Sequence, residues 1–408
     1  MNFYLNISSH VFSLWLLTFL GFLIALLITY VSIPSLVMIA KRKSFNATPN
    51  GRTSHTRSTP ILGGVVIFAG FILSTIIIAG AYFNHELVYI FSGLFILFIA
   101  GLKDDILELH PRNKLTAQII AAALIAVLAD IRLSNFHGLF NLHEIPYLPS
   151  ILVTIFVFIV IINGFNLIDG IDGLASGVTI LTSSILGIWF WKTGNIGYTV
   201  MSFTLAGSLI AFFRYNVFSK KNKIFMGDTG SLTIGLVMAT LTTRFLQLDL
   251  HVEGNMAIQS APAVAVGILI IPLFDTLRVF TIRISQGKSP FDADRQHIHH
   301  RLLQLGMTHL QTTLTLLAVN LAFIIMCYFL QGIGILWLMV VILATASLLS
   351  RLLMLFVAKR TNKVISTKYV SAENLETIYK KRKMLRLAPK APLVKEPEKQ
   401  AQVYNKTL

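Results

Sequence analysis

Long apolar stretches separated by short polar loops dominate the chain. The apolar stretches cover residues 11–31, 61–80, 87–102, 116–130, 150–165, 174–191, 197–213, 229–246, 259–277, 311–331 and 333–357. A helix needs about 20 mostly apolar residues to cross a bilayer. The pattern therefore predicts an all-α polytopic membrane protein, with about eleven transmembrane helices in a membrane domain over residues 1–357. Because that number is odd, the two termini would lie on opposite sides of the membrane.

The composition agrees with this pattern. Of the 408 residues, 55% are hydrophobic and only 13% are charged, and the mean hydropathy is +0.72. Soluble domains carry about 25% charged residues, so the composition excludes a soluble globular protein. The one cysteine, Cys327, lies in an apolar stretch, so no disulfide can form within the chain. The first apolar stretch lacks a basic leader and a small-residue cleavage site, so we interpret it as a retained span.

The net charge of +16 is spread unevenly over the loops. Cytoplasmic loops of membrane proteins are enriched in Lys and Arg. If the N-terminus lies outside, the basic residues gather inside, and the outer loops keep Arg132, Lys192 and Arg244. This distribution favours a multi-pass protein of the inner (plasma) membrane with a cytoplasmic C-terminus. It also indicates membrane lipids, and no nucleic acid, as the partner of the basic surface.

Residues 358–408 form a basic tail of different character, which this orientation places in the cytoplasm. The apolar side chains between Ser371 and Leu387 would share one face of a short amphipathic helix that can lie on an anionic membrane surface. The alternative is a solvated, loosely ordered tail. We expect residues 389–408 to be disordered.

The same orientation brings the acidic motifs to the inner surface. Asp104 and Asp105 follow the third apolar stretch directly, and Lys114 comes nine residues after Asp105. Adjacent carboxylates at the end of a span are costly to desolvate, and they can hold Mg²⁺ or accept a proton. Two solvated loop acids are the alternative interpretation.

A second motif carries amides and carboxylates between two spans. Asn166, Asp169 and Asp172 recur at a spacing of three, so a helix would present them on one face. Glycines in the same segment let the backbone approach a ligand closely. The alternative is a polar turn whose side chains cap the neighbouring helices.

A third motif, Gly227-Asp228-Thr229-Gly230-Ser231, opens the span at 229–246. The backbone N–H groups at a helix N-terminus suit a phosphate. An acid beside a phosphate calls for a cation between them, which points to Mg²⁺. Helix capping by Asp228 is the competing interpretation.

Two basic segments complete the inner face. The first contains Arg295, His297, His299, His300 and Arg301. Three histidines invite a zinc interpretation, but no cysteine accompanies them. Imidazoles with two arginines suit a pyrophosphate and sugar hydroxyls better.

The second basic segment precedes a glycine pair, Gly63-Gly64, and contains Arg52, His55 and Thr59. Together with Arg295, these three residues are secondary candidates for substrate binding. The alternative is a basic membrane anchor followed by a glycine pair that packs helices.

These motifs resemble those of the polyprenyl-phosphate N-acetylhexosamine-1-phosphate transferases, glycosyltransferase family 4, over residues of about 10–357. The resemblance rests on Lys103-Asp104-Asp105, on Asn166 to Gly173, on Met226 to Ser231 and on His297 to Arg301. It implies an all-helical bundle with a groove at the inner face and a catalytic role for residues 1–357. Members are often dimeric, so a homodimer is an open alternative to a monomer.

The resemblance also implies roles for individual residues. Asn166 and Asp228 would ligate Mg²⁺, with Mn²⁺ as an alternative ion. Asp104 and Asp105 would be the catalytic pair beside the lipid phosphate. The remaining candidates would bind substrate, with Asp172 at the uracil: Lys114, Asp169, Asp172, His297, His299, His300 and Arg301.

The histidine motif selects a branch of that family. Ile298 interrupts the histidines and Arg301 follows them, which resembles the undecaprenyl-phosphate GlcNAc-1-phosphate transferase branch. The implied reaction converts UDP-GlcNAc and undecaprenyl phosphate into undecaprenyl-diphospho-GlcNAc and UMP, the first membrane step of a cell-surface glycan. The alternatives are another UDP-sugar, namely a phospho-MurNAc-pentapeptide or deoxy-sugar donor, and a proton-coupled transporter with acids near the membrane midplane.

Overall fold

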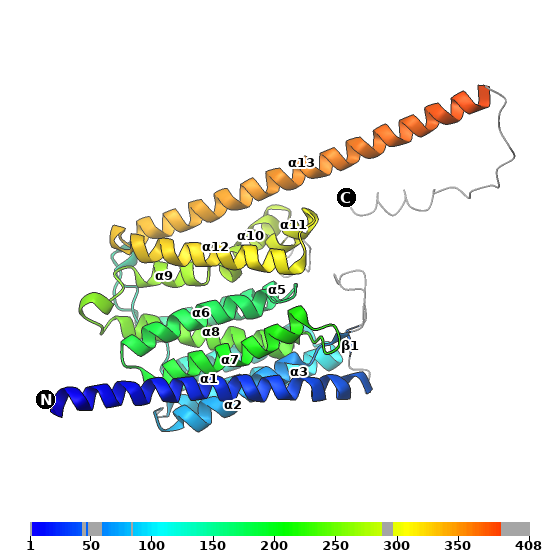
Figure 1. Cartoon of the computed structure of the whole chain (residues 1–408). Coiled ribbons are helices and arrows are strands. Elements are labelled where there is room, and N and C mark those ends of the chain that lie inside the picture. Colours follow the sequence, from blue (N-terminus) through cyan, green and yellow to red (C-terminus); the bar gives the residue numbers. More distant parts are fainter. Residues whose placement is uncertain (1, 43–45, 48–58, 83–84, 288–296, 385–408) are drawn as a thin grey trace. The chain divides into compact units, whose positions relative to one another are not determined.

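The computed structural model describes residues 2–42, 46–47, 59–82, 85–287 and 297–384 of the chain (Figure 1). The chain divides into two compact units, Met1–Leu353 and Met354–Leu408. The boundary expected from the sequence, between residues 357 and 358, stays a prediction. The acidic and histidine motifs all lie in the first unit.

The described part is almost entirely helical. The first half comprises α1 (Asn2–Arg42), β1 (Asn46–Ala47), β2 (Thr59–Pro60), α2 (Gly63–Ala79), η1 (Gly80–Tyr82), α3 (Glu86–Leu107), α4 (Pro111–Ala123), η2 (Leu124–Leu128), η3 (Leu139–Asn141), α5 (Tyr147–Ile168) and α6 (Leu174–Lys192). The second half comprises α7 (Ile196–Phe218), α8 (Gly227–Asp249), η4 (Gly254–Met256), α9 (Ala261–Ile268), α10 (Ile270–Ser285), α11 (Ile298–Gln304), α12 (His309–Leu330), η5 (Gln331–Ile333) and α13 (Ile335–Met384). The two short strands pair antiparallel, with Asn46 opposite Pro60.

Eight described helices are long and apolar enough to cross a membrane: α1, α3, α5, α6, α7, α8, α12 and α13. The pair α9 and α10 would make a ninth span, bent by 83° at its break. The apolar helix α2 has 17 residues, and the stretch at 116–130 falls on α4 and η2. A multi-pass, all-α membrane protein is thus confirmed. The number eleven and the orientation of the termini stay predictions.

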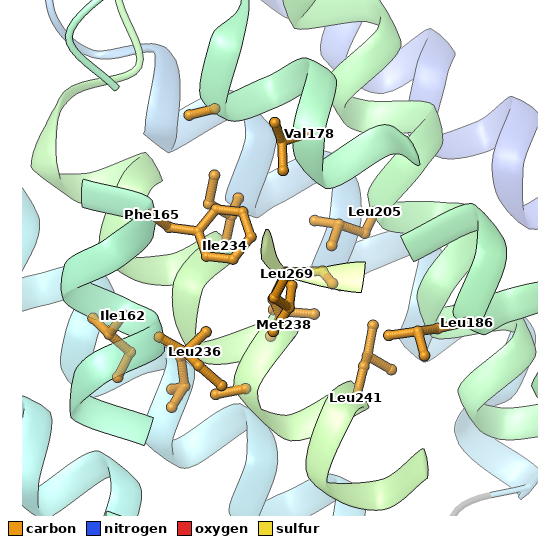
Figure 2. Close-up of a cluster of buried hydrophobic side chains, with 14 of the residues drawn as sticks. Ile162, Phe165, Val178, Leu186, Leu205, Ile234, Leu236, Met238, Leu241 and Leu269 are labelled. Carbon is orange, nitrogen blue, oxygen red and sulfur yellow. The ribbon is translucent and has the colours of Figure 1, made fainter. Parts of the chain in front are cut away.

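Helix α8 lies at the centre of the bundle. The apolar side chains around it come from five segments and are all buried (Figure 2): Ile162 and Phe165 of α5, Val178 and Leu186 of α6, Leu205 of α7, Ile234, Leu236, Met238 and Leu241 of α8, and Leu269. The most apolar window of α8 is 78% buried, whereas that of α13 is 22% buried. A peripheral helix must present apolar side chains to lipid, while a central one does not.

The central position explains why α8 can carry many small polar residues. The Thr233 hydroxyl donates to the Thr229 carbonyl at 2.5 Å, and the Thr240 hydroxyl donates to the Leu236 carbonyl at 2.8 Å. These bonds satisfy the hydroxyls inside the helix itself. Small side chains also allow neighbouring helices to approach closely, which is how helices pack within membranes.

The break between α9 and α10 comes at Leu269, and Pro272 lies in the first turn of α10. Proline is tolerated in a first turn because it lacks an N–H that would need a partner. A Cβ on Gly164 of α5 would lie 3.2 Å from the Cβ of Pro272, so the glycine lets α5 and α10 pack closely. The bend brings α10 against the end of α5 where the acidic motifs lie.

Candidate active site

The first turn of α8 is held by a carboxylate from another helix. Asp105, in the last turn of α3, accepts hydrogen bonds from the backbone nitrogens of Asp228 at 2.7 Å and Thr229 at 3.0 Å. It also accepts one from the Thr229 hydroxyl at 2.5 Å. The first N–H groups of a helix lack intrahelical partners, and a negative charge complements that end of the helix dipole. Asp105 therefore fixes the start of α8 relative to α3.

Glycines permit this close approach of α3 and α8. A Cβ on Gly101 of α3 would lie 2.5 Å from the Cα of Thr229 and 2.8 Å from the carbonyl carbon of Asp228. Gly227 has a φ of +72°, and a Cβ there would lie 2.6 Å from a carboxylate oxygen of Asp105. The glycines of the motif thus allow backbone contact where a side chain would not fit.

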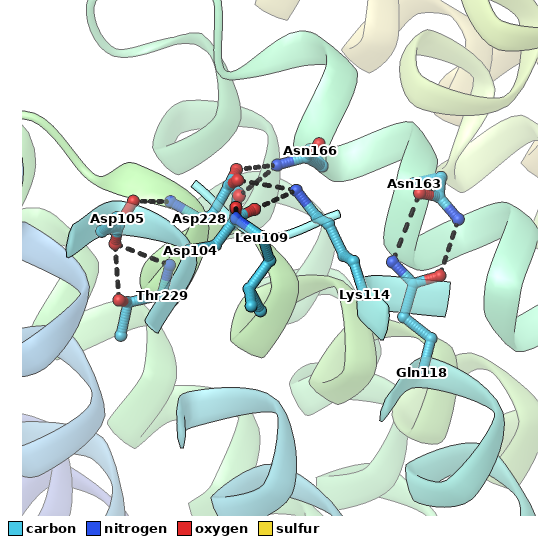
Figure 3. Close-up of polar contacts among 10 residues, drawn as sticks. Asp104, Asp105, Leu109, Lys114, Gln118, Asn163, Asn166, Asp228 and Thr229 are labelled. Carbon is cyan, nitrogen blue, oxygen red and sulfur yellow. Dashed lines mark hydrogen bonds and ion pairs between the residues drawn. The ribbon is translucent and has the colours of Figure 1, made fainter. Parts of the chain in front are cut away.

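Asp228 lies at the centre of a polar cluster built from α3, α4, α5 and α8 (Figure 3). The Lys114 ammonium lies 2.6 Å from Oδ2 of Asp228 and 3.1 Å from Oδ2 of Asp104. The Asn166 amide donates to Oδ1 of Asp228 at 2.5 Å and to the Ser231 hydroxyl at 2.8 Å. Candidates that are 123 positions apart in the sequence, Asp105 and Asp228, therefore meet at one end of the bundle.

A pair of side-chain amides holds in place the helix that carries Lys114. Gln118 of α4 and Asn163 of α5 exchange two hydrogen bonds, at 3.3 Å and 2.9 Å (Figure 3). Asn163 also donates to the Ile159 carbonyl at 2.8 Å. Because Lys114 lies one turn before Gln118, this pair fixes the helix that delivers the lysine to Asp228.

The cluster carries more negative than positive charge. Among the described residues, Lys114 is the cation that contacts Asp104 and Asp228, and Asp105 and Asp169 add two further carboxyl groups close to Asp228. Burial raises the pKa of Asp169 well above its ordinary value, and the nearby carboxylates of Asp228, Asp105 and Asp172 raise it further. Such an excess of carboxylates favours a site that also binds a cation.

The donor set fits Mg²⁺ rather than a fully protein-bound metal. Among the described residues, no group of three or more His, Cys, Asp or Glu side chains could hold an ion. Mg²⁺ is commonly held by one or two carboxylates and completes its shell with water and substrate phosphates. Asp228 supplies a carboxylate, and a rotation of the Asn166 amide by half a turn would present its oxygen. The residues present therefore fit the ion that the sequence predicts.

A second corner of the site surrounds Asp172. Its Oδ2 lies 2.6 Å from the Lys223 ammonium and 3.2 Å from Nδ1 of His309. Its carbonyl accepts a hydrogen bond from Thr313 at 2.8 Å. The backbone nitrogen of Gly173 donates to Asn216 at 2.7 Å. Asp172 thus belongs to a group separate from the Asp228 cluster.

The histidine motif begins with a buried pair. Nδ1 of His297 lies 2.9 Å from Oδ2 of Asp275, and the Ile298 backbone nitrogen donates to Oδ1 of Asp275 at 3.0 Å. The rings of His297 and His299 stack with centroids 5.5 Å apart, and His300 follows 4.3 Å from His299. The three imidazoles thus form one cluster of neighbouring rings at the start of α11.

His299 connects α11 to the Asp169–Gly173 loop. A Cβ on Gly170 would lie 2.8 Å from Nε2 of His299. His299 is 2% exposed, and its Nδ1 has no hydrogen-bond partner within the described residues. Burial lowers the pKa of His299 to about 3. A neutral, buried imidazole with an open nitrogen suits a ligand hydroxyl or amide rather than a free phosphate dianion.

An apolar cavity of about 180 Å³ lies beside His299 and Asp275. Helices α10, α12 and α13 line it with side chains such as Phe274, Leu316 and Phe323. Ile168, directly before Asp169, also contributes to the wall. An apolar ligand can therefore lie next to the polar site.

The segment that contains Thr59 supports the third motif through its backbone. The nitrogen of Phe225 donates to the Pro60 carbonyl at 2.8 Å. Gly63 and Gly64 then donate to the carbonyls of Phe225 and Met226, at 2.9 Å and 2.8 Å. Thr59 itself is buried. The glycine pair thus packs against the chain directly before Asp228, as the packing alternative anticipated.

Three secondary candidates, Arg52, His55 and Arg295, lie outside the described residues. Arg301 donates to Gln304 at 3.2 Å, and its Nε has no hydrogen-bond partner in the described part of the chain.

Lys41, at the end of α1, donates to the Lys221 carbonyl at 2.9 Å. This bond places the end of α1 beside the loop that leads into α8.

Comparison with known proteins adds an independent observation. The chain is 30% identical to the undecaprenyl-phosphate alpha-N-acetylglucosaminyl 1-phosphate transferase of Escherichia coli (strain K12) over 289 residues, which cover 70% of this chain and 76% of that protein. The model of glycosyl transferase family 4 matches residues 87–246. The chain belongs to glycosyl transferase family 4.

Two further relatives match over similar lengths. The enzyme of the same name from Salmonella typhimurium is 29% identical over 279 residues, 67% of this chain and 74% of its own. A probable undecaprenyl-phosphate N-acetylglucosaminyl 1-phosphate transferase of Bacillus subtilis is 29% identical over 306 residues, 74% and 82% of the two chains. This glycosyl transferase family 4 member is therefore a membrane-bound transferase.

The region that matches the family model contains the acidic motifs and ends before the histidines. The structure adds three residues that the sequence interpretation missed: Lys223, Asp275 and His309. The sequence could have revealed Asp275, because an acidic residue within an apolar stretch is a candidate functional residue. Lys223 and His309 carried no such signal, since each looks like an ordinary loop residue until the fold brings it to Asp172. The roles of the site residues stay predictions.

Proposed function

We propose that the protein transfers GlcNAc-1-phosphate from UDP-GlcNAc to undecaprenyl phosphate, releasing UMP, with Mg²⁺ and on the cytoplasmic face. The observation that carries the proposal is the cluster in which Lys114 lies between the carboxylates of Asp104 and Asp228. The Escherichia coli and Bacillus subtilis relatives carry the name of this transferase. The product would be undecaprenyl-diphospho-GlcNAc.

Charge neutralisation is the main task of such a site. The lipid phosphate and the pyrophosphate repel each other, so catalysis depends on positioning and on opposing charge. Lys114 is held by two carboxylates and can transfer its contacts to phosphate oxygens. Asn166 and Asp228 would hold Mg²⁺, which when bound would offset the pyrophosphate charge and stabilise the departing UMP.

The two adjacent aspartates would have different roles. Both oxygens of Asp105 accept hydrogen bonds from the first turn of α8. Asp104 accepts one from the Leu109 nitrogen at 2.6 Å, and its other oxygen faces Lys114. Asp104 would thus be the member of the pair that accepts the proton of the lipid phosphate. The gain is modest, because the second pKa of a phosphate monoester is near ~6 and much of the lipid is already a dianion.

The attacking lipid oxygen would form a bond to the β-phosphorus of UDP-GlcNAc while the bond to the UMP oxygen breaks. One phosphoanhydride replaces another, so the reaction is close to balanced in free energy. A covalent aspartyl-phosphosugar intermediate is the rival mechanism. The engagement of Asp105 and the contacts of Asp104 with Lys114 favour direct displacement.

The uridine, the sugar and the lipid chain would be bound by residues outside the Asp228 cluster. Asp172, with Lys223 and His309, would face the uridine. His297, His299, His300 and Arg301 would face the sugar and the pyrophosphate. The apolar cavity beside His299 would accept isoprene units of the lipid.

The placement of the acids favours an enzyme over a proton-coupled transporter. Asp104 and Asp105 lie in the last turn of α3, Asp169 follows the end of α5, and Asp228 lies in the first turn of α8. A proton relay needs acids near the membrane midplane. These acids instead lie at the ends of helices, where a soluble nucleotide-sugar would reach them.

The decisive experiment is an assay of the purified full chain with undecaprenyl phosphate and a panel of UDP-sugars. We expect UMP release and undecaprenyl-diphospho-GlcNAc with UDP-GlcNAc, and no product once the divalent cation is chelated. Restoring Mg²⁺, or substituting Mn²⁺, should restore turnover. Preference for UDP-MurNAc-pentapeptide or a deoxy-sugar would overturn the donor, and absence of UMP from every donor would overturn the reaction class.

A further inference from the structure

Asp275 joins two separate elements at the edge of the site. It lies on α10, the second half of the bent pair, and contacts the first two residues of the histidine motif. One oxygen lies 2.9 Å from Nδ1 of His297, and the other accepts the Ile298 nitrogen at 3.0 Å. Arg278, one turn further along α10, is 3.9 Å away. Asp275 is 3% exposed and His297 is 4% exposed, so water does not weaken these contacts.

The two contacts fix different parts of His297 and its helix. If the Asp275 carboxylate is ionised it only accepts hydrogen bonds, so Nδ1 of His297 would be the donor and Nε2 the ring nitrogen left for a ligand. The His297 side chain makes no capping bond of its own at the start of α11. The bond from Ile298 to Asp275 takes over this function, since the first N–H groups of a helix need outside acceptors.

The orientation of the His297 ring affects the position of the neighbouring His299 ring. Its ring stacks on that of His299 with planes 7° apart, and His299 in turn meets the loop at Gly170. A rotation of the first ring would therefore disturb the second. A buried carboxylate behind a histidine is the arrangement that fixes tautomer and ring orientation in many metal and catalytic sites.

We propose that Asp275 is a positioning residue for the transferase reaction: it fixes the hydrogen of His297 on Nδ1 and thereby presents Nε2 to the sugar-phosphate donor. Asp275 acts through His297 and does not touch the reacting atoms. The inference rests on the proposed function, so its test includes a measurement that does not depend on turnover.

The perturbation is Asp275→Asn. The asparagine oxygen can still accept the Ile298 nitrogen, so the start of α11 is retained. Its NH₂ group can only donate, which favours the His297 tautomer with the hydrogen on Nε2. We expect kcat/KM for UDP-GlcNAc to fall by about 10- to 100-fold, the usual effect of losing an outer partner of a functional histidine.

A matched control separates positioning from general damage. Asp249 at the end of α8 is also buried and accepts a single backbone bond from Ile258 at 2.9 Å. It has no histidine partner among the described contacts. Asp249→Asn should leave kcat/KM within about twofold of wild type, a range ordinary for a site far from the chemistry.

The independent measurement is nitrogen NMR of ¹⁵N-histidine-labelled protein, with the His297 signal assigned from its loss in His297→Gln. We expect the hydrogen on Nδ1 in the wild type and on Nε2 in Asp275→Asn. An unchanged tautomer overturns the inference even if activity falls. If wild type shows no turnover with UDP-GlcNAc, the proposed function fails while the tautomer result still decides the role of Asp275.

A double-mutant cycle separates a role that acts through His297 from an independent role in the fold. If Asp275 acts through His297, the double variant Asp275→Asn with His297→Gln should be no slower than His297→Gln alone. Multiplied losses would show that Asp275 serves the fold independently of His297, and would overturn the proposal.

Discussion

Replacing Gly101 with alanine gives the sharpest test of how the site is assembled. The new Cβ would lie 2.5 Å from the Cα of Thr229 and 2.6 Å from its nitrogen. Both are backbone atoms of the first turn of α8, so no side-chain rotation can relieve the clash. Ordinary contact begins at 3.4 Å, and the start of α8 must therefore retreat by 3.4 minus 2.5, about 0.9 Å.

The size of the effect follows from that displacement. Overpacking of this kind costs about 1–3 kcal/mol of stability. The larger consequence is for Asp228, which precedes Thr229 and loses its register with Asp105 and Lys114. A misplacement of about 1 Å in a catalytic site can cost about 10²-fold in rate, so we expect kcat to fall by about that factor.

The assay compares two glycine-to-alanine variants. A Cβ added at Gly80 would meet no atom within 4 Å, so Gly80→Ala should keep the turnover and the unfolding temperature of the wild type. Thermal unfolding followed by tryptophan fluorescence checks that Gly101→Ala remains folded. Turnover of Gly101→Ala within about twofold of wild type would refute the view that contact between α3 and α8 positions Asp228.

Three further outcomes are expected. Asp228→Asn should abolish turnover at every Mg²⁺ concentration while the protein stays folded, because Asn keeps the size of the side chain but lacks the negative charge that would hold the cation; near-normal turnover would exclude the ligand role. Gly170→Ala should lower kcat/KM about tenfold by displacing His299, whose Nε2 lies 2.8 Å from the added Cβ; unchanged kinetics would contradict that contact. In a cysteine-free background, Glu253→Cys should react with an impermeant thiol reagent in intact cells and Glu108→Cys should not; the reverse pattern would invert the topology.

The sequence predicted the helices well, because apolar stretches are dictated by lipid and need no tertiary information. Their breaks were harder: the bend before Pro272 lies inside one continuous apolar stretch, which hides it. Only Leu269 separates the two helices, and its apolar side chain is as compatible with one continuous helix as with a break. Helix packing, rather than local pattern, decides the bend.

The sequence predicted candidate residues for the site but not the contacts between them. Asp104 and Asp105 look equivalent in the sequence, yet successive helix positions point in directions about 100° apart. One therefore faces Lys114 while the other caps α8. The link from Asp275 to His297 joins positions 22 apart across a segment with no regular pattern, so only the fold reveals it.

The central position of α8 has a consequence for how the protein is made. Asp104, Lys114 and Asn166 are synthesised before α8, and Asp228 arrives with it, so no partial chain can hold the complete site. Helix α8 carries five threonines and one serine, and its most apolar window has the lowest mean hydropathy of the eight candidate spans, 1.2. We therefore expect its integration to be helped by the earlier helices, which supply the side chains that bury it. A chain that stalls before residue 227 would leave those helices without their centre, with buried faces open to lipid and to quality-control proteases.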